Sequence, residues 1–148
     1  MEKAKKNLKV TAICIIAVTL VKLITSIITF AINGVEVPEN MITPEITKDA
    51  AYAVMVISWA LSLAFNLPSF YVGLKGLKVA KNPDNSKGHI VWAVILLVFA
   101  VIAALSCVSQ LSSAKDMTTA VLETVSVVCS VVLYFIFVME AKKVRPAA

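Results

Sequence analysis

The stretch that decides the fold is residues 90–111, IVWAVILLVFAVIAALSCVSQL, which contains no Asp, Glu, Lys or Arg. A helix that crosses about 30 Å of hydrocarbon needs about 20 mainly apolar residues, because each residue adds 1.5 Å of rise. Residues 90–111 meet this requirement. Backbone amides find no water at that depth, so this stretch must satisfy them internally as a helix.

Three further stretches have the same character: residues 8–32, 50–74 and 120–141. None of them alternates apolar and polar residues as a barrel strand does. The chain of 148 residues is 59% hydrophobic and 16% charged, whereas soluble domains average roughly 45–50% and about 25%. The sequence therefore predicts an all-α integral membrane protein whose residues 1–148 form one domain with four spans.

Residues between the spans predict where the helices end. Gly34 is suited to the left-handed cap that closes a helix, so the first helix should end at Asn33. Thr43 and Pro44 have the residue types of an N-cap and a first helical position. Pro83 prevents the second helix from continuing. Because the connections are short, neighbouring helices should be antiparallel and form a four-helix bundle.

The distribution of basic residues predicts the orientation in the membrane. Two basic residues, Lys48 and Lys115, flank the spans on one side. The other side carries Lys3, Lys5, Lys6, Lys9, Lys75, Lys78, Lys81, Lys87, Lys142, Lys143 and Arg145. Cytoplasmic loops carry the excess of Lys and Arg. We therefore expect both termini and the middle loop to lie in the cytoplasm, with the chain in the inner (plasma) membrane.

Polar residues inside the spans are the candidate functional residues. At 100° per residue they share one stripe on each of three helices. On the second and fourth helices these stripes are Ser58, Ser62, Asn66, Ser69, Gly73, Gly76 and Thr119, Glu123, Ser126, Ser130, Tyr134. We expect the stripes to face one another, either as a packed seam or as a solvated cavity. The candidate intramembrane site is Lys22, Ser26, Ser62, Asn66, Ser130 and Glu123.

Lys22 is the most informative residue of this candidate site. Counted from Leu8, it lies about 21 Å along the first helix, near the middle of a bilayer. A charge at that depth costs roughly 2.5–3.5 kcal/mol and normally has a partner. Three interpretations stay open: a structural pair, with Glu123 as the nearest acid; a site for an anionic group; and a lysine kept neutral by desolvation.

Two aromatic or ring-bearing residues are expected to act through packing or at the interface. Trp59 lies too deep in its span for the interfacial aromatic belt, so we expect it to pack between helices. His89 precedes the third span, where we expect it to contact lipid headgroups.

Two features of the second span lie toward its cytoplasmic end. Pro68 removes a backbone hydrogen bond and predicts a break, which is either a simple bend or a hinge. Lys75, Lys78 and Lys81 recur at every third position. They either set the topology or contact an anionic lipid or a partner.

The stretch from Gly73-x-x-Gly76 through these lysines to Asn82-Pro83, between two apolar spans, resembles small four-span bacterial membrane proteins without assigned function. The resemblance implies a fold and a compartment, and it does not imply an activity.

Residues needed for catalysis are sparse. His89 is the single histidine, and Cys14, Cys107 and Cys129 form no CxxC pair. The two acids inside the predicted spans, Glu123 and Glu140, lie near opposite ends of the fourth span. These counts disfavour a metal site, a cofactor and an enzyme. The basic residues lie beside apolar spans without interleaved aromatics, which disfavours nucleic-acid binding.

The sequence thus predicts a non-enzymatic accessory or interaction protein that contacts the bilayer and another membrane protein or a second copy of itself. The alternative is a small transporter or channel subunit that handles a polar or anionic solute at Lys22.

Overall fold

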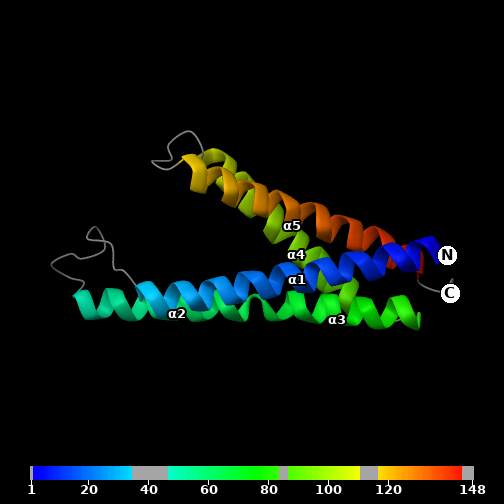
Figure 1. The fold of residues 1–148 in the computed structure, drawn as a ribbon, viewed down its shortest axis with the longest axis horizontal. Helices are drawn as coiled ribbons and strands as arrows, with labels where there is room; N and C mark the ends of the chain where they lie inside the picture. The colour runs from blue at the N-terminus through cyan, green and yellow to red at the C-terminus, as the bar shows by residue number, and fades with distance from the viewer. Residues whose placement is uncertain (1, 35–46, 84–86, 111–116, 145–148) are drawn as a thin grey trace. The chain divides into compact units, whose positions relative to one another are not determined.

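The computed structural model describes residues 2–34, 47–83, 87–110 and 117–144. Within these ranges the chain forms helices joined by turns, with no strand. Figure 1 shows the helices α1 (Glu2–Asn33), α2 (Lys48–Ala64), α3 (Leu67–Lys81), α4 (Gly88–Gln110) and α5 (Met117–Val144). The predicted all-α fold is confirmed.

Four helical segments are long and apolar enough to cross a membrane, and they match the four predicted spans. They are Glu2–Ile32, Lys48–Lys81, Gly88–Ser109 and Ala120–Val144. The helices extend beyond the predicted spans, because polar and basic residues such as those of Glu2–Asn7 continue the helical hydrogen bonding after the apolar stretch has ended.

The helix ends follow from local chemistry. Gly34 has φ 64° and donates its N–H to the Phe30 carbonyl at 2.9 Å, which confirms the predicted left-handed cap. Thr43 and Pro44 lie outside the described residues. The N-cap of α2 is Thr47, whose hydroxyl oxygen accepts the Ala50 N–H at 3.3 Å. α3 ends at Lys81, two residues before Pro83, as predicted.

The second span is interrupted, and the interruption separates α2 from α3. The helix stops at Ala64, a turn follows at Phe65 and Asn66, and α3 begins at Leu67. The Asn66 N–H donates to the carbonyl of Leu63, three residues earlier, at 3.0 Å. This bond closes a tighter turn than the four-residue bond of an α-helix. Pro68 has no N–H to offer the Ala64 carbonyl, which accounts for the interruption at Phe65 and Asn66; the roles of Pro68 as a simple bend or as a hinge stay predictions.

The helices form two compact units. The first comprises Met1–Ala17 and Pro68–Ala148, and the second comprises Val18–Leu67. The boundary in the second span falls at the Leu67–Pro68 bond, next to the turn that interrupts the helix.

The first unit is an antiparallel four-helix arrangement with a packed core. α1 and α4 begin, and α3 and α5 end, at the same end of this unit (Figure 1). We call it the terminal end. All four helices contribute to its core, which consists of Ala4, Leu8, Ala12, Ile15, Val72, Val79, Ala80, Ile90, Ala93, Phe137, Val138, Ala141 and Val144.

The second unit contains the later part of α1 and all of α2. Its best-defined contact is an aromatic stack: the Phe30 and Trp59 rings have centroids 4.0 Å apart and an interplanar angle of 17°. The indole Nε1–H of Trp59 donates to the Ser26 hydroxyl at 3.0 Å. The predicted packing role of Trp59 is therefore confirmed, and its polar atom has a partner inside the unit.

Candidate functional site

The candidate intramembrane residues fall in both units. Lys22, Ser26, Ser62 and Asn66 belong to the second unit, and Glu123 and Ser130 belong to the first. The Lys22 and Glu123 side chains are exposed, whereas Ser130 is buried. Their assembly into one site stays a prediction, and so does each interpretation of Lys22.

Several polar side chains of the spans bond to the backbone one turn earlier in their own segment. The Ser62 hydroxyl donates to the Trp59 carbonyl at 2.7 Å, and the Asn66 amide donates to the Ser62 carbonyl at 2.9 Å. The Ser130 hydroxyl donates to the Ser126 carbonyl at 3.0 Å. The Ser58 hydroxyl donates to the Val54 carbonyl, and the Ser109 hydroxyl donates to the Ser106 carbonyl. Backbone acceptors satisfy these hydroxyl protons, so such residues tolerate an apolar environment.

Two hydrogen bonds among the described residues are of a different kind, because each joins two helices. Besides the bond from Trp59 to Ser26, the Tyr134 hydroxyl of α5 donates to the Ser69 hydroxyl of α3 at 2.8 Å. Ser69 is 6% exposed and lies directly after Pro68. This bond brings one residue from each of the two predicted stripes together in the first unit, and the meeting of the rest of the stripes stays a prediction.

Two glycines allow α3 to approach its neighbours closely. A Cβ atom on Gly73 would lie 2.5 Å from Cγ1 of Ile16, and one on Gly76 would overlap the Phe137 ring. Both glycines are buried. The Gly73-x-x-Gly76 spacing therefore lets one face of α3 approach both α1 and α5 closely, in the manner of small-residue contacts in membrane bundles.

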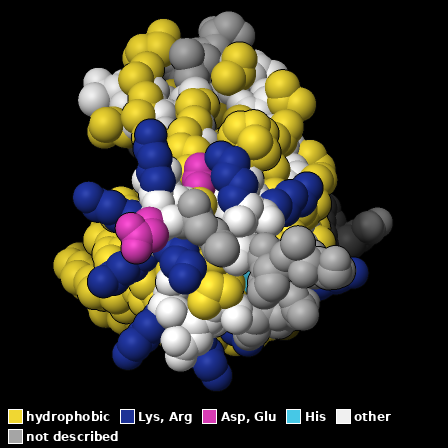
Figure 2. Space-filling model, turned by 90° about the vertical axis from the view of Figure 1, so that its right-hand side faces the viewer, with side chains coloured by type: hydrophobic (Ala, Val, Ile, Leu, Met, Phe, Trp, Pro, Cys, Tyr) yellow, Lys and Arg dark blue, Asp and Glu magenta, His cyan; other side chains and the backbone are white. Residues whose placement is uncertain are grey.

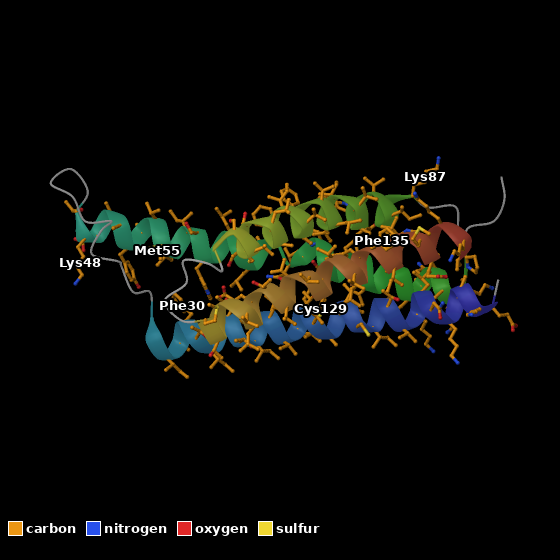
Figure 3. The ribbon with its side chains drawn as sticks, turned by 90° about the horizontal axis from the view of Figure 1, so that it is seen from above. Phe30, Lys48, Met55, Lys87, Cys129 and Phe135 are labelled. Atoms are coloured by element: carbon orange, nitrogen blue, oxygen red, sulfur yellow. The ribbon has the colours of Figure 1, made fainter. Side chains whose placement is uncertain are left out.

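The terminal end is strongly basic. Figure 2 shows Lys side chains gathered over this end, with acidic side chains among them and apolar surface around them. Lys78 and Lys81 are exposed in the last turn of α3, where positive charge is favourable, and Lys75 is half-buried. Lys87 projects outward just before α4 (Figure 3). Their roles as topology signal or as lipid contact stay predictions.

The expected headgroup contact of His89 is wrong. Its side chain is fully buried, and its ring lies edge-on to Phe137 with centroids 6.2 Å apart and an interplanar angle of 87°. The core of the terminal end, built from residues distant in the sequence, covers this histidine.

A polar groove at the terminal end was not anticipated from the sequence. It has a volume of about 510 Å³ and is lined by Lys3, Ala4, Asn7, Glu140 and Lys143. Glu140 is 9% exposed and accepts a hydrogen bond from Lys143 Nζ at 3.0 Å. The spacing of an acid and a base three residues apart was the one local signal for this pair.

Reactive groups are dispersed in the part of the chain that the structure describes. Cys14, Cys107 and Cys129 are free thiols, and no three His, Cys, Asp or Glu side chains among the described residues are placed to hold a metal ion. Comparison with protein-family models, with curated proteins and with solved structures finds no match for the chain.

Proposed function

We propose that the chain is a non-enzymatic integral membrane protein of a bacterial plasma membrane whose span surfaces bind another membrane protein or a second copy of itself. Both termini and the basic terminal end face the cytoplasm. This orientation is supported by the basic residues of the first unit, which gather at one end (Figure 2).

The observation that carries the proposal is the placement of buried and exposed side chains. The core lies at the terminal end, whereas α2 has a single buried residue, Ala51, over its whole length. Side chains project outward along the helices, as Phe135 does on α5, where it is 55% exposed (Figure 3). Contact with lipid acyl chains is sufficient to explain the exposed apolar side chains. The exposed Lys22 and Glu123 favour a protein surface instead, because charge facing acyl chains is costly.

A specific observation favours the second candidate, a small transporter or channel subunit. The second span is interrupted at Phe65 and Asn66, and helices broken within the membrane often line solute sites. Under this proposal Lys22 and the polar residues of α2 would handle a polar or anionic solute.

The variant Lys22→Met separates the two candidates, with Val21→Met as the matched control because Val21 is 64% exposed and carries no charge. The variants are compared by photo-crosslinking from position 24 in native membranes, by energy transfer between labelled copies in liposomes, and by anion flux in liposomes. An interaction role predicts crosslinked or paired species that Lys22→Met reduces by more than about tenfold, since 1.4 kcal/mol is tenfold in affinity and a charge at that depth is worth roughly 2.5–3.5 kcal/mol.

The opposite pattern would contradict the interaction proposal. It consists of a monomer that neither crosslinks nor pairs, together with an anion flux that Lys22→Met abolishes and Val21→Met preserves. This second pattern supports the transporter.

A further inference from the structure

The groove at the terminal end has the size and the lining of a ligand site. Its volume of about 510 Å³ lies within the usual range of roughly 300–1,000 Å³ for such sites. α1 contributes Lys3, Ala4 and Asn7, and α5 contributes Glu140 and Lys143, so the first and last helices of the chain form its two walls. The small Ala4 side chain, 9% exposed, leaves the space between the polar groups open.

The charges of the groove favour an anion. Glu140 is nearly buried and accepts a hydrogen bond from Lys143 Nζ at 3.0 Å, while the Lys143 side chain is 55% exposed. The buried carboxylate therefore holds one ammonium group at the mouth of the groove. Lys3 supplies a second ammonium, and the Asn7 amide supplies a neutral donor. Two ammonium groups against one carboxylate leave a net positive charge, and lysine is a common phosphate-binding residue.

Exposed apolar side chains follow the groove residues at helical spacing on both helices. On α1, Val10 lies one turn after Asn7 and two turns after Lys3, and it is 53% exposed. On α5, the positions one and two turns before Glu140 are Ile136 and Val132, which are 38% and 49% exposed. A free phosphate has no apolar part that could contact these side chains, whereas the acyl chains of a phospholipid could pack against them.

We infer that this groove binds the phosphate group of an anionic phospholipid, with Lys3, Asn7 and Lys143 around the headgroup and the acyl chains along Val10, Ile136 and Val132. Basic pockets between spanning helices on the cytoplasmic side bind anionic headgroups in this way. The lining of the groove does not include Lys75, Lys78 or Lys81 of α3. The site depends on membrane insertion with the terminal end at the lipid headgroups, and it does not depend on a protein partner.

The test uses the full chain in a mild detergent and measures the melting temperature during titration with phosphatidylglycerol, phosphatidylcholine or glycerol phosphate. The double variant Lys3→Gln/Lys143→Gln removes the two ammonium groups of the groove. The matched control, Lys5→Gln/Lys9→Gln, removes two charges from the opposite face of α1. Far-UV circular dichroism checks that both variants keep the helical fold.

We expect phosphatidylglycerol to raise the melting temperature of the parent chain and of the control, with little effect from phosphatidylcholine or glycerol phosphate. The groove variant should bind phosphatidylglycerol about thirty-fold more weakly, since each lysine near an anionic lipid is worth about fivefold. Equal weakening in both variants would overturn the inference, because it indicates unspecific attraction. An equal response to glycerol phosphate would overturn the assignment to a lipid.

Discussion

Single hydroxyl groups connect the helices at two points where a hydrophobic contact alone would leave a polar atom unsatisfied. Trp59 Nε1 donates to Ser26, and the Tyr134 hydroxyl donates to Ser69. Other serines, such as Ser58 and Ser62, donate to carbonyls of their own helix. The difference lies in the neighbour: a serine joins two helices where an aromatic donor from another helix reaches it.

The bond between Tyr134 and Ser69 should contribute modestly to stability. Tyr134→Phe and Ser69→Ala should each lower the free energy of unfolding by about 0.6 kcal/mol, the average for hydrogen bonds between spanning helices. The double variant should lose little more than either single variant, because both remove the same bond. Unfolding in a denaturing detergent measures these values. Fully additive losses would show that the two side chains act independently.

At the scale of the element, α3 owes its position to the absence of side chains at Gly73 and Gly76. These residues admit Ile16 of α1 and Phe137 of α5, and Phe137 is itself fully buried. The aromatic ring of Phe137 is rigid and cannot rearrange as a flexible aliphatic side chain could. It therefore leaves no room for a Cβ atom at Gly76.

The variant Gly76→Ala should therefore destabilise the first unit, although alanine is the better helix former. Overpacking of a filled core costs about 1–3 kcal/mol, whereas the change from glycine to alanine gains about 1 kcal/mol in helix propensity. At the upper end of its range, the overpacking cost exceeds this gain. Gly76→Val should cost more than Gly76→Ala. Adding Phe137→Leu to Gly76→Val should cost less than the sum of the two single changes, because the smaller side chain makes room. Unfolding in a denaturing detergent measures all four chains, and a stabilising Gly76→Val would contradict the described packing.

The sequence predicts some features of these elements well. The four apolar stretches, the cap at Gly34 and the break at Pro68 depend on residues close together in the chain, so local chemistry suffices. The burial of His89 and the groove beside Glu140 depend on which helices meet and in what register. No short stretch of sequence encodes that pairing. A residue next to a span, such as His89, is therefore predicted to lie at the surface although it is buried.

At the scale of the whole molecule, the account depends on how the chain crosses the membrane. Four crossings by the four candidate spans would put Lys48 and Met117 on one side of the membrane, and Lys6, Lys78 and Lys142 on the other. The proposals for the span surfaces and for the lipid site both require the second of these sides to be the cytoplasmic one.

Labelling with a membrane-impermeant maleimide tests this arrangement most directly. The three native cysteines, Cys14, Cys107 and Cys129, are replaced by alanine, and a single cysteine is introduced by Lys6→Cys, Lys48→Cys, Lys78→Cys, Met117→Cys or Lys142→Cys. We predict that Lys48→Cys and Met117→Cys react in intact cells, whereas the other three react only after permeabilisation. Reaction of Lys6→Cys, Lys78→Cys or Lys142→Cys in intact cells, or a chain recovered without detergent in the soluble fraction, would contradict the account.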